Sequence, residues 1–273
     1  MPVHYQDQNI TVFQSALFQT TSTVAVTEEA VIIVDPTWLP EEIREIQNHV
    51  ALVSKGRKQY LVFTHSDYDH ILGYHAFPEA VTIASRAFVS NSRKEETVEE
   101  IKQFDDNYYI VRPYGIEYPY IDIIIDNDEQ MIEAGSHTLT FYLAPGHNVD
   151  GMFILIDHLG VLITGDYLSD VEFPFIYQNS EAYERSLQKV KSLYEKQKIN
   201  FLIPGHGSVT SSPAEIKDRL DDSLWYIEQL RKTTEEDGEY HVLEAFVDGY
   251  GFSTFMKKMH HKNIELVKRE KDA

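Results

Sequence analysis

The chain has 273 residues, of which 42% are hydrophobic and 25% charged, enough for one large domain or two small ones with a sizeable core. Acidic residues outnumber basic ones by 44 to 24, and the formal net charge of −20 disfavours binding to nucleic acid or to an anionic membrane surface. The absence of cysteine excludes disulfides, zinc fingers and thiolate catalysis. With no secretory signal pattern and no apolar run long enough for a membrane span, we expect a soluble, cytoplasmic protein.

The first part of the chain predicts several strands and one helix. Short segments rich in β-branched or apolar residues predict strands at Ile10–Leu17, Thr23–Val26, Ala30–Val34 and Tyr60–Phe63. An amphipathic helix is expected after Pro40, with acidic residues in its first turn and an end near Gly56. Polar residues begin abruptly at Thr64, where the last of these strands ends.

The remaining chain alternates between predicted helices and strands. Helices are expected at Lys94–Phe104, Ala182–Lys198 and Pro213–Arg231, and strands at His137–Leu143, Met152–Ile156, Val161–Thr164 and Phe201–Ile203. The tyrosine-rich stretch 108–120, which precedes an apolar run at 121–125, either lines a pocket or forms a half-exposed strand edge. The charged segment beyond Gly238 is expected to end in a partly mobile helix. Strands followed by alternating strand and helix favour a layered α/β domain.

Four predicted strands end in turns that present histidine or aspartate. The turns read HSDYDH at 65–70, PGHN at 145–148, TGD at 164–166 and PGHG at 204–207. Ligands collect at such strand ends in sheets that are covered by helices. Any one of these turns alone is explained by ordinary turn or capping chemistry, but four in matching positions indicate a common site.

Together these turns supply seven donors for a metal. They are His65, His70, His147 and His206, with the carboxylates of Asp67, Asp69 and Asp166. Seven ligands are too many for one tetrahedral zinc with an open position, and they suit two adjacent metals that share a carboxylate. Nitrogen and oxygen donors without sulfur fit zinc, iron or manganese.

The motif set resembles that of the metallo-β-lactamase-fold hydrolase superfamily, over about residues 10–210. That resemblance implies an α/β (α+β) fold, a four-layer αββα sandwich with a dinuclear site at the edge of its two sheets. It also implies that Asp35, after the strand ending at Val34, supports a metal-binding histidine. We expect residues 1–273 to form a single domain of this fold, with residues 211–273 as a C-terminal helical extension that covers the site or mediates a homodimer.

By the same resemblance, a first metal is held by His65, Asp67 and His147, and a second by Asp69, His70 and His206, with Asp166 bridging. The sequence departs from the family at Asp67, where the family has a histidine. Two consequences stay open: the added carboxylate shifts the metal preference from zinc toward iron or manganese, or it weakens the first position so that one metal remains.

The expected activity is hydrolysis by two divalent ions, zinc being favoured over iron or manganese, with a bridging hydroxide that attacks a small-molecule ester, thioester, lactone or phosphoester. Asp69 is a candidate proton acceptor, and Tyr167 and Tyr68 either donate to the oxyanion or pack beside the site. Two alternatives remain. One is a non-heme di-iron oxidoreductase of flavodiiron type with a separate electron donor, since that family resembles this motif with a glutamate at the position of Asp67. The other is a catalytically silent binding module.

Overall fold

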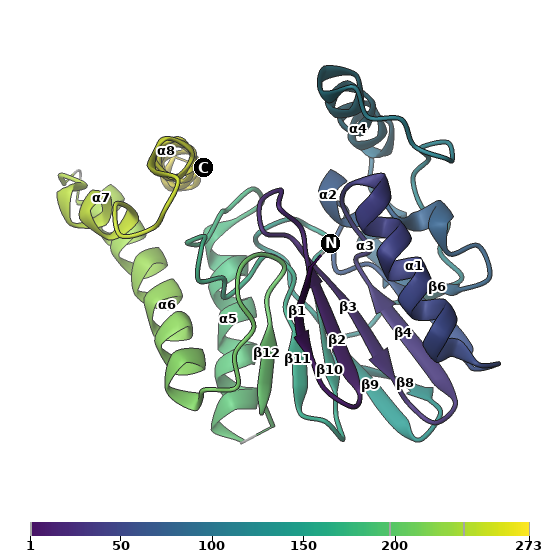
Figure 1. The fold of residues 1–273 in the computed structure, drawn as a ribbon. Coiled ribbons are helices and arrows are strands. Elements are labelled where there is room, and N and C mark those ends of the chain that lie inside the picture. The colour runs from purple at the N-terminus through teal and green to yellow at the C-terminus, as the bar shows by residue number, and fades with distance from the viewer. Residues whose placement is uncertain (1, 197, 237, 273) are drawn as a thin grey trace.

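The computed structural model describes residues 2–196, 198–236 and 238–272, and its two β-sheets pack face to face (Figure 1). The first sheet holds, in spatial order, β1 (Val3–Gln6), β2 (Ile10–Gln14), β3 (Thr21–Val26), β4 (Ala30–Val34), β5 (Lys58–Val62), β6 (Val81–Ser85) and β7 (Ile123–Ile125). The second holds β12 (Phe201–Ile203), β11 (Val161–Ile163), β10 (Met152–Ile156), β9 (His137–Leu143) and β8 (Gln130–Ala134). Strands β4 to β7 pair in parallel, and so do β11 and β12.

Helices cover the outer face of each sheet. On the side of the first sheet lie α1 (Pro40–Ser54), α2 (Tyr68–Ile71), α3 (Arg86–Val89) and α4 (Lys94–Tyr108), with a short 3-10 helix at Tyr74–Ala76. On the side of the second sheet lie α5 (Ser180–Glu195), α6 (Pro213–Glu235), α7 (His241–Val247) and α8 (Ser253–Lys271). The predicted four-layer αββα sandwich is therefore confirmed.

Strand periodicity explains why the layers assemble. In β4, Ile32 and Val34 point into the core between the sheets, whereas Val31 and Ile33 pack toward α1. In β10, Ile154 faces the core between the sheets and its neighbours face the helices of the second side. Because successive side chains of a strand alternate between its faces, a continuous apolar strand is buried on both sides and needs helices outside the sheet.

Most predicted elements are present, several with shifted ends. The strands predicted at Ala30–Val34, His137–Leu143, Met152–Ile156 and Phe201–Ile203 have the expected bounds. The first predicted strand ends at Gln14 instead of Leu17, because the chain turns there through left-handed Phe18 and Gln19. Helices α4 and α6 extend one turn beyond their predicted ends, and β1, β6, β8, α2, α3 and α7 were not predicted.

The tyrosine-rich stretch after α4 contains no strand between residues 109 and 122, so the expectation of a strand edge is wrong. Two of its hydroxyls bond to backbone carbonyls of the first half: Tyr114 to Leu72 and Tyr118 to Phe88. Tyr109 and Tyr120 are exposed. The stretch therefore fastens the loop between α4 and β7 to the outer core of the first sheet.

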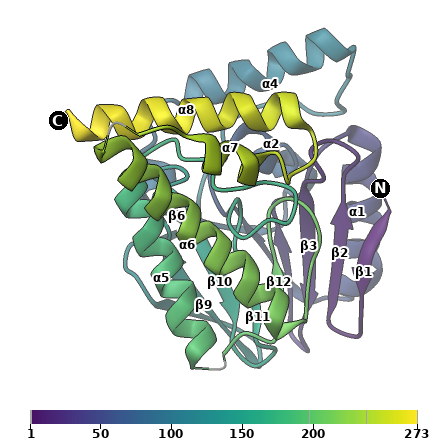
Figure 2. The same cartoon turned by 90° about the vertical axis from the view of Figure 1, so that its left-hand side faces the viewer.

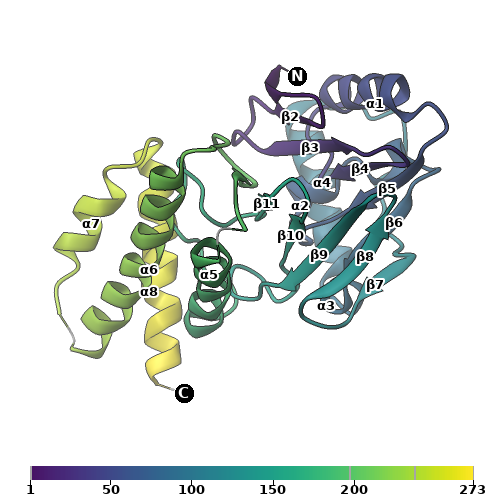
Figure 3. The same cartoon turned by 90° about the horizontal axis from the view of Figure 1, so that it is seen from below.

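The C-terminal segment, in which a charged helix was expected, forms α7 and α8, both of which pack against α6, with α7 beyond α6 on the side away from the sheets (Figure 3). Met256, Met259 and Asn263 on α8 are buried, and these helices share their apolar core with β9 to β12. Both α4 and α8 lie beyond the edge of the sandwich that carries α2 (Figures 1 and 2). Among the described residues, no helix is both long and apolar enough to span a membrane.

Candidate metal centre

The four donor turns meet at one edge of the sandwich because backbone hydrogen bonds tie them together. The amide of Met152 donates to the carbonyl of Thr64, at 2.9 Å, and thereby joins the two sheets. The amide of Gly205 donates to the carbonyl of Gly165, and that of Thr21 to the carbonyl of Gly205. Backbone hydrogen bonds alone thus fix the turns after β5, β9, β11 and β12 relative to one another.

Asp166 lies at the centre of the cluster, and its two carboxylate oxygens face different sets of donors. Its Oδ2 lies 3.2 Å from His147 Nε2 and 3.6 Å from His65 Nε2. Its Oδ1 lies 3.1 Å from His70 Nε2 and 3.2 Å from His206 Nε2. A carboxylate that faces two imidazole pairs in this way is placed to bridge two cations.

Asp67, the departure from the family pattern, joins the group around Asp166 Oδ2. Its Oδ2 lies 3.2 Å from His147 Nε2 and 3.7 Å from His65 Nε2. Its other oxygen accepts a hydrogen bond from the Asn148 side-chain amide at 2.6 Å. The four donor atoms of His65, Asp67, His147 and Asp166 all lie within 4.8 Å of one another, so the carboxylate belongs to the group that the resemblance implies for the first metal.

Asp69 completes the second group. Its Oδ2 lies 3.6 Å from His206 Nε2 and 3.7 Å from His70 Nε2. The Thr20 hydroxyl donates to the same oxygen at 3.3 Å and accepts a hydrogen bond from Trp38 Nε1 at 2.8 Å. The structure therefore brings together all seven predicted donors, in the two groups that the resemblance implies.

Each of the four imidazoles bonds through Nδ1 to the protein and presents Nε2 to the cluster. Asp35 Oδ2 lies 3.0 Å from His70 Nδ1, which confirms the expected support of a histidine by Asp35. The Thr64 hydroxyl donates to the same Asp35 oxygen and lies 2.9 Å from His65 Nδ1. In the second sheet the partners are backbone carbonyls, which lie at 2.8 Å for His147 (Phe175 O) and at 2.9 Å for His206 (Phe18 O).

Unpartnered buried atoms test whether this donor set fits metals. His65 Nε2, His70 Nε2 and Asp166 Oδ1 are buried without a hydrogen-bond partner among the described residues, a costly arrangement unless something else binds them. Ligands about 2.0–2.1 Å from a tetrahedral zinc lie roughly 3.3 Å apart, close to the spacings around Asp166. The donor atoms and their spacing fit two cations.

The electrostatics of the cluster also favour positive charge. Burial by itself lowers the pKa of His206, but Glu172 and Asp166 outweigh it and raise that pKa to about 10. Burial raises the pKa of Asp166, yet the four surrounding imidazoles hold it well below its usual range. The carboxylates thus favour protonated imidazoles, and divalent ions that bind these imidazoles would displace the protons.

Glycine permits the close approach of two turns. A Cβ on Gly205, the residue before His206, would lie 2.5 Å from Asp166 Oδ1. A Cβ on Gly165, whose φ is +53°, would lie 2.9 Å from the Thr64 hydroxyl. Larger side chains at either position would push the turns apart, so these glycines are required by the cluster itself.

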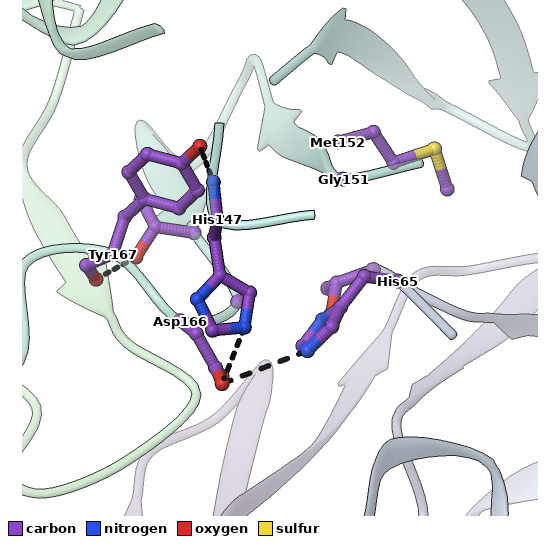
Figure 4. Close-up of a pocket in the computed structure, with 9 residues that line it drawn as sticks. His65, His147, Gly151, Met152, Asp166 and Tyr167 are labelled. Atoms are coloured by element: carbon purple, nitrogen blue, oxygen red, sulfur yellow. Dashed lines mark hydrogen bonds and ion pairs between the residues drawn. The ribbon is translucent and has the colours of Figure 1, made fainter. Parts of the chain in front are cut away.

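Tyr167 lies beside the cluster and bonds to the backbone of a neighbouring turn. Its hydroxyl accepts from the amide of His147 and lies near the carbonyls of Ala144 and Pro145, at 3.0–3.1 Å (Figure 4). Burial raises the pKa of this tyrosine well above its usual value. The contacts support the packing interpretation of Tyr167, because its hydroxyl is directed at the turn and not at the carboxylates. Tyr68 packs edge-on against Trp38.

Three residues near the centre were not found by sequence reasoning. Thr20 supports Asp69, Asn263 of α8 supports the loop that contacts His147, and Glu172 lies beside Asp166 and His206. Thr20 and Glu172 stand in loops without a periodic pattern, and Asn263 stands in a helix of charged composition. The distances along the chain between these three residues and the donor turns follow no known motif, so a single sequence does not indicate their roles.

Known proteins resemble this chain in both sequence pattern and fold. The sequence model of the metallo-beta-lactamase superfamily matches residues 16–206. Among solved structures, a metallo-beta-lactamase from Pontibacter korlensis has 15% identity and a TM-score of 0.58, covering 82% of this chain and 98% of its own. ETHE1 from Myxococcus xanthus has 18% identity and a TM-score of 0.56, with coverages of 81% and 90%.

A third structure, the sec-alkylsulfatase Pisa1 from Pseudomonas sp., has 13% identity and a TM-score of 0.64, covering 87% of this chain. This chain spans only 45% of the alkylsulfatase. At such identities the structures show a shared fold and do not identify a shared substrate. The sequence match covers more than half of the chain and ends at His206, the last of the seven donors, so the chain belongs to the metallo-beta-lactamase superfamily.

Proposed function

We propose that the protein is a metal-dependent hydrolase whose dinuclear centre acts on a small-molecule ester, thioester, lactone or phosphoester. The observation that carries this proposal is the placement of Asp166, whose two oxygens face two separate pairs of imidazoles. Two bound divalent cations would lower the pKa of a water molecule between them until hydroxide is available near neutral pH. Metal-dependent hydrolysis is also the chemistry of the superfamily to which the chain belongs.

The residues of the chain would divide the remaining tasks. His65, Asp67 and His147 would hold one cation, and Asp69, His70 and His206 the other. Asp69 would also accept the proton released during attack, since the Thr20 hydroxyl fixes its Oδ2 at 3.3 Å. Thr20 is itself held by Trp38, so the acceptor is positioned before a substrate arrives.

Metal analysis and a substrate screen together test the proposal. Protein purified without chelator is expected to carry about two zinc or manganese ions per chain. Ester, thioester, lactone and phosphodiester substrates are then screened, and activity is expected to disappear on chelation and return when metal is restored. Activity that survives complete removal of metal would refute the proposal, and protein that binds no zinc, iron or manganese would favour a silent binding module.

Asp67 favours a second candidate, a di-iron oxidoreductase that receives electrons from a separate partner. A carboxylate in place of an imidazole hardens the donor set and favours iron or manganese over zinc. Two iron ions per chain and oxygen reduction with an added flavin reductase would support this candidate. A colourless two-zinc protein that hydrolyses a substrate would rule it out.

A further inference from the structure

The geometry points to Glu172 as an eighth donor of the metal centre, at the position of Asp69, His70 and His206, and to a centre that selects uncharged or cationic substrates over anionic ones. This inference rests on the proposed function. Glu172 lies in the loop that follows Asp166, outside the four donor turns. Its carboxylate, Asp166 and His206 each offer a ligand atom, and these atoms lie within 4.8 Å of one another.

Glu172 is not engaged elsewhere in the described part of the chain: its carboxylate makes neither a hydrogen bond nor an ion pair there. The buried Asp166 Oδ1 and His70 Nε2, which lack hydrogen-bond partners, belong to the same position. The second position therefore combines unpartnered buried donors with a free carboxylate beside them. A cation there would be bound by Glu172 in addition to the family ligands.

The loop that carries Glu172 is fixed against the turn of His206. Ser169 Oγ accepts hydrogen bonds from the amides of Val171 and Glu172, at 3.0 and 3.1 Å. Asp170 accepts from the amide of Ser208 at 2.7 Å. These contacts hold the backbone of Glu172 in place before metal binds.

Two further features keep this loop close to the turn. Arg219 of α6 donates to the carbonyls of Leu168 and Ser208, so it spans the loop and the turn. Gly207, at φ +88°, leaves room for Asp170, since a Cβ there would lie 2.1 Å from Asp170 Oδ1. Glu172 is thus presented by a rigid support, as a ligand requires.

The charge of the completed centre determines which substrates it accepts. Asp67, Asp69, Asp166 and Glu172 contribute four negative charges, which two divalent cations only neutralise, and a hydroxide makes the sum negative. No lysine or arginine forms an ion pair with any of these carboxylates among residues 2–196, 198–236 and 238–272. The carboxylates of the centre itself therefore repel an anionic substrate, and Lys262, whose Nζ lies 6.0 Å from the Tyr177 ring centroid, is a cation outside the centre.

Aromatic side chains next to the centre add apolar surface. Tyr177, whose ring centroid lies 4.9 Å from that of His147, is 46% exposed, and Phe18, whose backbone carbonyl contacts His206 and whose ring stacks on Trp38, is 43% exposed. Apolar rings beside a negative centre suit uncharged or amine-bearing substrates, the latter also through cation–π contacts. Neutral esters, lactones and cationic esters fit this description better than sulfate or phosphate esters.

Metal titration of variants tests the role of Glu172 without using activity. Zinc and manganese are titrated into metal-free protein in competition with a chromophoric chelator, for wild type, E172Q, E172D and E195Q. Glu195, exposed at the end of α5, controls for loss of one negative charge. In E172Q one of the two ions is expected to bind at least roughly 10- to 100-fold more weakly, with the other unchanged.

The conservative variant separates ligation from electrostatic attraction. If Glu172 is a ligand, E172D also loses affinity, because its shorter side chain cannot reach the ion, whereas wild-type affinity in E172D would indicate attraction alone and overturn the assignment. Equal affinities in E172Q and wild type would also overturn it and leave the proposed function intact. Failure of the wild type to bind two ions would instead count against the proposed function. Circular dichroism of each variant confirms that it is folded.

Inorganic phosphate serves as the probe of anion discrimination. At zinc concentrations that saturate both positions, phosphate is expected to bind E172Q at least about tenfold more tightly than wild type or E195Q, measured by calorimetry. Equal binding to wild type and E172Q would refute the substrate inference. The metal titration would then still decide the ligand assignment separately.

Discussion

The histidines of the two sheets are supported in different ways. Those of the first sheet, His65 and His70, depend on one buried carboxylate, because Asp35 binds His70 directly and reaches His65 through the Thr64 hydroxyl. Those of the second sheet depend on backbone carbonyls of distant loops, with the Thr20 hydroxyl as a further contact 3.3 Å from His206 Nδ1. A supporting carboxylate requires aspartate or glutamate at that position and can therefore be recognised in the sequence. A supporting carbonyl is present in every residue, so its role depends only on where the loop lies.

The loop that supports His147 is in turn held by the C-terminal helices. The Asn263 side chain donates to the carbonyl of Pro174 at 2.6 Å and accepts from the amide of Ile176 at 3.0 Å. The carbonyl that contacts His147 belongs to the residue between these two. A segment beyond the family match therefore positions His147, which we propose as a ligand of the first metal.

Asp166 links the two sheets, so its replacement should have the largest effect. In D166N neither pair of imidazoles faces a bridging carboxylate, and we expect binding of both ions and all hydrolysis to be lost. Metal content and activity are measured beside D106N, which removes an exposed aspartate of α4. Two ions bound to D166N with wild-type affinity would contradict the bridging role.

Replacing Asp35 should weaken both ions through the first sheet. D35N retains the size of the side chain but removes the charge that Thr64 and His70 share. Outer partners of metal ligands typically contribute 10- to 100-fold to affinity, and we expect a loss of roughly that size for each ion. Chelator competition measures both affinities. A loss restricted to one ion would show that Thr64 does not transmit the effect to His65.

Sequence reasoning predicted the fold and the donors because both rest on local patterns. Apolar strands such as Ala30–Val34 indicate burial on two faces, and each donor lies in a turn that follows such a strand, three of the four turns containing glycine. Asp35 also follows directly after such a strand, β4, and its support of a histidine was predicted from the family resemblance. The unpredicted β1 and β8 carry mixed exposed and half-buried residues, and α2 and α3 have only four residues each, too few for a periodic signal.

What the sequence could not predict depends on contacts between distant segments. Asn263 lies 87 residues from Ile176, and the carbonyl of Phe18 lies 188 residues from His206. Glu172 differs from other loop glutamates only by where Ser169 and Asp170 place it. Such positions follow from tertiary packing, which local patterns in a single sequence do not predict.

Replacing Asn263 should act on one ion and so distinguish the two sheets. In N263A the loop loses two buried hydrogen bonds, with an expected cost of about 1–3 kcal/mol in the free energy of unfolding. Because His147 contacts only the first position, we expect a several-fold weaker first ion and an unchanged second ion, by chelator competition. E265A, at an exposed position of α8, serves as control. Equal weakening of both ions would mean that α8 acts on stability alone.

The smallest expected effect is a pH dependence that arises in the same C-terminal network. The Asn263 side chain donates to the Tyr226 hydroxyl oxygen at 3.1 Å, and that hydroxyl lies within hydrogen-bond distance of His260 Nδ1, 2.8 Å away. Burial lowers the pKa of His260 below 6.5, a shift that nearby His261 increases and Glu244 opposes.

The unfolded chain therefore binds a proton at a pH where folded His260 does not. The free energy of unfolding should fall as the pH drops below about 6.5 and stop falling through this group once the folded pKa is passed. Urea midpoints of metal-free wild type and H260Q are compared between about pH 7.5 and pH 5.5, with H261Q as the exposed control. Glutamine can accept from Tyr226 without titrating, so H260Q should lose part of the acid sensitivity and H261Q should keep it. An unchanged slope in H260Q would place the acid sensitivity outside the helices that support His147.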